Sequence, residues 1–298
     1  MVWCLSGVVA LEILVTYSRI PAPELYHVSN DGLAGGFGRV LVFLNFPLAL
    51  AAIAVTLAVY GRLRSRAEQL LAVAAIVLCA VVAWPGVVEQ SDLDPKPVNA
   101  LPAIGVALAL ALTLRTGFAL GFSPLARAGG LWRVSIAVVV LAVSLPWLAA
   151  DLGFYLDRVP VLGRIFLTGD LRTQPGDPVP HPAVHHGHHH GMDGTLLVLT
   201  ALLLAPTVST VGRRLRPVLA GLLALMFCYG VGNIANDAWL EQVVKRGWTT
   251  WEIPGVTVPH VNGGWGVILL GAVFIWVLWR FATVGRDDRE TRRLAVPK

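Results

Sequence analysis

Eight stretches of 17 to 22 mostly apolar residues run through this 298-residue chain, and their length limits what it can fold into. About 20 such residues span the hydrocarbon core of a bilayer as a helix, the conformation that satisfies every backbone polar group within one segment. The stretches are Val2–Ser18, Val40–Tyr60, Leu70–Val88, Ala100–Leu120, Val134–Asp151, Thr195–Val211, Val218–Trp239 and Gly264–Ala282. We therefore predict an all-α fold, a polytopic integral membrane helix bundle of about eight transmembrane helices that forms a single membrane domain over residues 1–298.

Composition and proline positions agree with this prediction. The mean hydropathy is +0.69, and only 14% of residues are charged, against about 25% in soluble globular proteins. Pro47, Pro85, Pro146 and Pro206 interrupt four of the stretches, where lipid-embedded helices tolerate kinks. The first stretch lacks the basic flank and cleavage site of a signal peptide, so we expect it to be retained as a helix.

The distribution of basic residues predicts how the chain is oriented. The segments 61–69, 121–133, 212–217 and 283–298 carry 13 Lys and Arg in 44 residues, whereas the alternate segments 19–39, 89–99, 152–194 and 240–263 carry 8 in 99. Short cytoplasmic loops carry the excess of Lys and Arg. Both termini are then cytoplasmic, in a multi-pass protein of the cell (inner) membrane. The strong preference for Arg over Lys is typical of a GC-rich bacterial genome, and the scattered basic residues form no stripe that would bind nucleic acid.

Six of the eight histidines lie between residues 181 and 190, inside the alternate segment 152–194. The predicted orientation makes this segment extracytoplasmic. Imidazole is a common ligand for Zn, Cu, Ni and Fe, and several imidazoles on one loop can converge on one ion. The sequence therefore predicts an extracytoplasmic His-rich metal site for a divalent transition metal, Zn or Cu. Its candidate ligands are His181, His185, His186, His188, His189 and His190, with help from His27, His260 and Asp237. A solvated His-rich tract that binds metal weakly is the alternative.

Other polar residues mark the same predicted outer ends of the helices. Asn233, Asp237 and Glu241 are spaced to line one helix face, and Asp193 is placed to cap the helix expected near Thr195. Glu12 is the one acid expected near mid-membrane, where a charge costs at least about 2 to 3 kcal/mol unless it is paired or hydrated. A structural hydrogen bond between helices and a place on an ion path are both open for Glu12.

The loop before the histidines is predicted from its composition. Val161–Phe166 interleaves apolar residues with arginine, which fits either a short amphipathic segment lying in the membrane interface or a plain structured loop. Thr173–Pro182 is rich in proline and is expected to be a tether containing several turns.

The depth of the polar residues decides between functions. The expected outer halves of the helices hold most of the Asn, Asp and Glu residues, and the inner halves are nearly apolar, which predicts a cavity that opens outward over a closed floor. The main hypothesis is metal capture and delivery, or metal-dependent chemistry, at the outer face; the sequence leaves open whether a reaction is catalysed. A metal-ion transporter and a non-catalytic membrane assembly subunit are the alternatives. The partners expected are the lipid bilayer, a metal ion and a further membrane protein.

Overall fold

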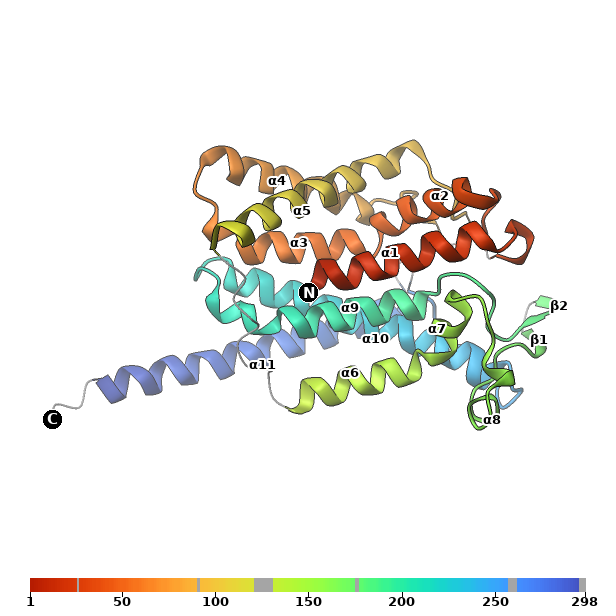
Figure 1. Ribbon diagram of the computed structural model, residues 1–298. Helices are drawn as coiled ribbons and strands as arrows, with labels where there is room; N and C mark the ends of the chain where they lie inside the picture. Colours follow the sequence, from red (N-terminus) through yellow and green to blue (C-terminus); the bar gives the residue numbers. More distant parts are fainter. Residues whose placement is uncertain (26, 90–91, 121–130, 175–176, 257–261, 295–298) are drawn as a thin grey trace.

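The computed structural model describes the chain except residues 26, 90–91, 121–130, 175–176, 257–261 and 295–298 (Figure 1). In the described part, six helices are long and apolar enough to cross a membrane, and two bent pairs meet the same test together. The single helices are α1 (Val2–Arg19), α4 (Arg66–Ala80), α5 (Ala100–Leu120), α9 (His190–Leu204), α10 (Arg216–Trp239) and α11 (Gly263–Leu294). The pairs are α2 (Gly32–Asn45) with α3 (Leu48–Val59), and α6 (Leu131–Val143) with α7 (Leu145–Asp151). These coincide with the eight apolar stretches, so the prediction of a helical bundle with six to eight possible spans is confirmed.

Proline accounts for both bends. Pro47 directly precedes α3, which makes an angle of 48° with α2, and Pro146 is the second residue of α7, which makes an angle of 56° with α6. Proline has no N–H to donate, so the ladder of helical hydrogen bonds is broken there. The other two predicted kinks differ: Pro206 opens the 3₁₀ segment Ala205–Thr210 that ends α9, and Pro85 lies after the last turn following α4.

Helix α9 lies at the centre of the bundle, in contact with α1, α3, α6, α7 and α10 (Figure 1). Its closest neighbour is α10, and glycine permits the approach. A Cβ atom on Gly194 would lie 2.5 Å from the carbonyl oxygen of Gly230, and a Cβ on Gly230 would lie 2.5 Å from the carbonyl oxygen of Gly194. Small residues at such crossings are typical of helix pairs in membranes, where close van der Waals packing holds helices together.

The outer helices present apolar side chains on the surface of the bundle. Leu70 and Val77 on α4 and Leu270 and Phe274 on α11 are all more than half exposed. Contiguous apolar surface of this kind is unusual on a soluble monomer and is typical of contact with lipid.

The chain connections gather at two opposite ends of the bundle (Figure 1). The α3–α4 and α9–α10 connections, two of the four basic segments, lie at the end from which α11 projects. The α1–α2 connection and the segment from α7 to α9 lie at the other end. The two groups of loops on which the orientation was predicted are therefore separated by the length of the bundle. Which end faces the cytoplasm stays a prediction.

The segment between α7 and α9 is folded onto the end of the bundle. It contains the one-turn helix α8 (Leu162–Ile165) and an antiparallel hairpin of β1 (Leu171–Gln174) and β2 (Asp177–Pro182). The expectation of a turn-containing tether at 173–182 was therefore wrong, because antiparallel backbone pairing between β1 and β2 makes the described residues there strands. The all-α prediction also omitted this small hairpin.

Side chains beyond the end of α10 hold this segment in place. They come from the π-helical extension of α10 (Leu240–Val244) and from Lys245 directly after it. The Gln242 amide donates to the carbonyl of Leu167 (2.7 Å) and accepts from its N–H (2.8 Å), and the Lys245 ammonium donates to the carbonyl of Ala183 (2.9 Å). Ala183 and Val184 are completely buried. The histidines that follow therefore enter the bundle instead of extending into solvent.

Candidate metal centre

The backbone at Gly187 and His188 places one imidazole deep among the helices. Gly187 has a positive φ of 106°, and a Cβ atom there would lie 2.7 Å from the Tyr17 hydroxyl. Only glycine fits this conformation and this contact easily. The next backbone N–H, that of His188, donates to the same hydroxyl at 3.1 Å. The His188 ring is thereby fixed beside α1, with 4% of the residue exposed.

The Nδ1 atom of His188 faces two carboxylates from different helices. It lies 3.5 Å from Asp151 Oδ2, at the end of α7, and 3.8 Å from Glu12 Oε2, on α1. All three ligand atoms lie within 4.8 Å of one another. Ligand atoms at 2.0–2.1 Å from a tetrahedral zinc ion are separated by about 3.4 Å. The spacing therefore suits a metal ion with only small side-chain adjustments.

The other ring nitrogen of His188 is held by a carboxylate. Nε2 lies 2.7 Å from Asp193 Oδ1, in the first turn of α9. A metal-bound histidine usually donates its second N–H to such a group, which orients the ring and makes the free nitrogen more basic. Asp193 was expected to cap a helix starting near Thr195, but α9 begins at His190 and has no side-chain cap. Its carboxylate instead directs Nδ1 of His188 toward Asp151 and Glu12.

Polar atoms of Asp151 and His188 lack hydrogen-bond partners among the protein atoms that the structure describes. Both carboxylate oxygens of Asp151 and Nδ1 of His188 are buried without a hydrogen-bond partner. Each buried unsatisfied polar atom costs about 1–3 kcal/mol, and more where the group is charged. If both carboxylates were ionised, their repulsion across at most 4.8 Å would add at least about 3.5 kcal/mol at an effective dielectric constant near 20. A cation bound among the three residues removes both penalties.

The electrostatic environment of His188 favours positive charge, and that of its neighbours does not. Burial alone lowers the pKa of His188, but the charge of the hydrogen-bonded Asp193 and the nearby carboxylates of Asp151 and Glu12 outweigh it and raise this pKa well above its ordinary value. Burial, followed by the charge of His189, holds the pKa of His185 well below its ordinary range. Burial and the charge of His188 lower the pKa of His189 to about 3. His185 and His189 are therefore neutral imidazoles beside a position that attracts cations.

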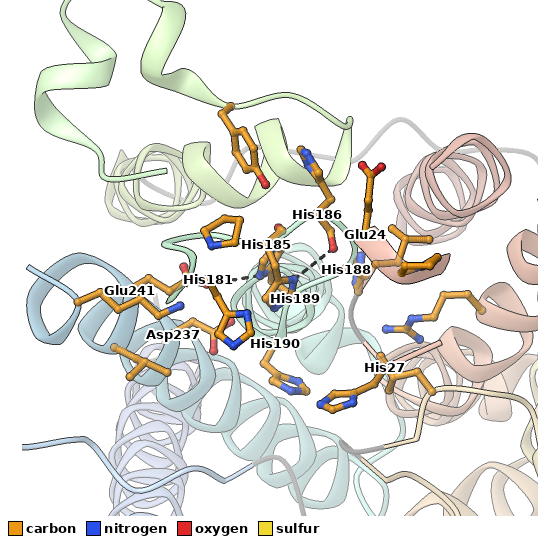
Figure 2. A pocket seen from close by; sticks show the side chains of 18 residues that line it. Glu24, His27, His181, His185, His186, His188, His189, His190, Asp237 and Glu241 are labelled. Atoms are coloured by element: carbon orange, nitrogen blue, oxygen red, sulfur yellow. Dashed lines mark hydrogen bonds and ion pairs between the residues drawn. The ribbon is translucent and has the colours of Figure 1, made fainter. Parts of the chain in front are cut away.

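A cavity of about 770 Å³ adjoins this group. Histidines from three parts of the chain, with acidic side chains of α10 and its extension, surround it (Figure 2). Of the residues that the sequence singled out as metal ligands, those that line it are His27, His181, His185, His186, His188, His189, His190 and Asp237. His260 lies outside the described residues. The cavity thus brings together the whole described part of the predicted set. Glu12 lies beside His188, and Asp151 lies beside His188 and, at 3.9 Å, His189.

The remaining histidines have other neighbours. The rings of His185 and His189 stack at 4.3 Å, and His189 Nε2 donates to the His185 carbonyl at 3.0 Å. His189 Nδ1 lies 3.6 Å from Glu241 Oε1. His186 stacks on Tyr155 at 4.2 Å. His27 and His181 are exposed at the rim.

The polar face predicted on α10 is bonded to the start of α9. Asp237 Oδ2 accepts from the N–H of Gly191 at 2.6 Å, which satisfies one free donor of the helix N-terminus. The extension of α10 adds Glu241, which accepts from the indole N–H of Trp147, a ring lying directly against Gly191. Asp237 thus supports the backbone that carries His188 and Asp193.

Sequence reasoning placed Glu12 and Asp151 outside the metal site, although both were visible as acids in or at the end of apolar stretches. Their separation from His188 in the chain, 176 and 37 residues, left no spacing to join them. Asn45, a polar residue of α2 that the sequence also offered Glu12 as a neighbour from the second apolar stretch, exchanges hydrogen bonds with Asn99. Arg19 donates to the carbonyl of Leu152.

No protein-family model, curated protein or solved structure matches this chain. The functional argument therefore rests on the site itself.

Proposed function

We propose that this chain is a membrane protein that binds one divalent transition-metal ion between Glu12, Asp151 and His188. The observation that carries the proposal is the Asp151 carboxylate, which is 1% exposed and has no hydrogen-bond partner on either oxygen among the described residues. Buried charges in proteins are paired or coordinate metals. Nδ1 of His188, equally unsatisfied, faces the same point.

The ligand set favours zinc among the candidate ions. It combines one imidazole with two carboxylates and contains no thiolate or thioether of the kind that selects Cu(I). Imidazole in turn disfavours Mg²⁺ and Ca²⁺, which prefer oxygen ligands throughout. Of the two metals that the histidine cluster suggests, Zn²⁺ is therefore the better fit.

The cavity next to the ligands favours chemistry at the metal over storage. Catalytic zinc sites have three protein ligands and leave a further position for water or substrate, and the bound ion lowers the pKa of that water to about 7. A volume of about 770 Å³ lies within the range of about 300–1,000 Å³ typical of small-molecule sites. The neutral rings of His185 and His189 are suited to pass the ion inward from the rim, since neutral imidazole is the form that binds metals.

A transport function has less support. Glu12 lies within the possible span Val2–Arg19, as an ion path requires. However, the buried unsatisfied groups that the structure describes on α1, α3 and α9 outside the ligand group are all hydroxyls, those of Ser6, Ser18, Thr56 and Thr200. Hydroxyls alone are weak ligands for a transition metal, and transporters place binding groups near the midplane. For an assembly subunit, no feature of the site favours a particular partner.

We also propose that the cavity faces away from the cytoplasm in a bacterial inner membrane. The support is the excess of Lys and Arg in the loops predicted at the opposite side.

Metal analysis of the purified protein tests the proposal. We expect about one equivalent of metal per chain, lost in Asp151→Asn and His188→Ala and retained in the matched rim variant His181→Ala. The alternative, a site made by the mobile tract of histidines, gives the reverse pattern. Equal metal content in wild type and Asp151→Asn, or none in either, would end the proposal for this group of residues.

A further inference from the structure

One buried arginine in the cavity wall has no counter-charge. Arg39, on α2, is 5% exposed, yet it makes no hydrogen bond or ion pair with any residue in the described part of the chain, and its Nε is unsatisfied. The contact that it does make is with the face of the Tyr17 ring, whose centroid lies 5.8 Å from Cζ. A buried charge without a partner costs several kcal/mol, so the position calls for an anion.

Two acids that share a smaller cavity with Arg39 have other partners. Glu89 and Asp193 line a smaller cavity together with Arg39, but Glu89 bonds to Lys96, and Asp193 bonds to His188. The segments outside the described residues contain no Asp or Glu. The acids of α11 whose side chains are not described follow Arg280, at the end of the bundle opposite the cavity (Figure 1).

Gly36 allows α2 to pack closely against α1, which places Arg39 near the metal ligands. A Cβ atom on Gly36, one turn earlier on α2, would lie 2.2 Å from the Ser18 hydroxyl oxygen, so α2 approaches α1 as closely as glycine allows. The Tyr17 side chain contacts both Arg39 and His188. The face of its ring lies against Arg39, and its hydroxyl accepts a hydrogen bond from the N–H of His188. Arg39 and His188 line the same cavity.

We propose that Arg39 binds an oxyanion of the ligand, a phosphate group, in the cavity beside the metal. Guanidinium presents paired N–H donors that match phosphate oxygens, and it is weakly hydrated, which suits a buried site. The inference rests on the proposed function in that the phosphate lies next to the metal ligands. The ligand class is then a phosphate ester or free phosphate. The cavity is large enough for either phosphate or a lipid headgroup.

Calorimetric titration of the purified protein with inorganic phosphate and with dihexanoyl phosphatidic acid tests this. We expect Arg39→Gln to weaken binding at least tenfold, Arg39→Lys to weaken it less, and Arg172→Gln, which removes an exposed arginine of β1 outside the cavity, to leave it unchanged. Binding of both probes indicates a site for phosphate itself, and binding of the lipid alone indicates a headgroup site. Unchanged affinity in Arg39→Gln, or no binding of either probe to wild type, overturns the inference.

Two further measurements keep this result separate from the metal proposal. Metal content should be the same in wild type and Arg39→Gln, and phosphate binding should persist in His188→Ala. If phosphate binds through Arg39 while wild type holds no metal, the metal proposal alone fails. If metal is bound and phosphate binding is lost in His188→Ala but retained in Arg39→Gln, the anion binds to the metal and the role of Arg39 is refuted. The thermal unfolding of each variant shows whether a loss reflects misfolding, in which case Arg39→Lys decides.

Discussion

Asp193 should control metal affinity without touching the metal. Its carboxylate lies 2.7 Å from Nε2 of His188, and it makes no hydrogen bond or ion pair with Glu12 or Asp151. Replacing a group that orients a metal-bound histidine typically weakens metal binding 10- to 100-fold. Asp193→Asn keeps the shape and one acceptor oxygen but removes the charge, so we expect about a tenfold loss. Asp193→Ala also removes the hydrogen bond, so we expect a loss nearer 100-fold, or about 2.8 kcal/mol at 1.4 kcal/mol per factor of ten.

Competition with a chromophoric zinc chelator measures these affinities in detergent solution. Asp170→Asn, which removes an exposed acid before β1, is the matched control and should bind zinc as wild type does. In a His188→Ala background, whatever weak zinc binding remains should not fall further with Asp193→Asn, because the effect of Asp193 passes through the imidazole. Equal affinities for wild type and Asp193→Ala would refute the assignment of Nδ1 as a ligand. Full additivity with His188→Ala would show that Asp193 acts by another route.

Three further predictions follow from the packing and the predicted orientation. Gly187→Ala should destabilise the fold by about 1–3 kcal/mol, because alanine is strained at positive φ and its Cβ would press on the Tyr17 hydroxyl; thermal unfolding measures the loss, and Gly212→Ala, where a Cβ has open space, should lack it. Gly230→Ala should lower the unfolding temperature by separating α9 from α10, and an unchanged temperature would contradict the close crossing. Cysteines at the exposed positions Arg64 and Arg172 should react with impermeant maleimide from opposite faces of membrane vesicles, in a background without Cys4; labelling from one face would overturn the topology.

The helices of this bundle could be predicted from the chain because lipid imposes one simple requirement. A stretch such as Gly264–Ala282 must be a helix if it crosses a bilayer, whatever it packs against. The bends at Pro47 and Pro146 have an equally local cause, the missing N–H of proline. The hairpin at 171–182 was missed because its two strands are short and the segment contains four prolines and a glycine, a composition that also describes an irregular loop.

The candidate site was predicted only in part, for a different physical reason. The histidine cluster is a local feature of the sequence, and its members do line one cavity. Which ring could hold an ion depends on burial and on carboxylates brought from α1, α7 and α9 by the packing of the bundle. Glu12 stood out as a charge in an apolar stretch, but two explanations were open to it. Only the three-dimensional contact with His188 and Asp151 distinguishes them.

The contrast among the histidines explains why a cluster of six would serve one metal position. His188 is surrounded by carboxylates and favours positive charge, whereas the partly buried His185 and the buried His189 favour the neutral ring. An ion that enters among neutral imidazoles meets ligands without repulsion, and it gains the charge interaction only at the floor. Arg39, on the α2 side of the same cavity, places a positive charge on the face of the Tyr17 ring, whose hydroxyl contacts His188. A cation and an oxyanion can therefore be held side by side, which is the arrangement that a metal-dependent reaction of a phosphate ester requires.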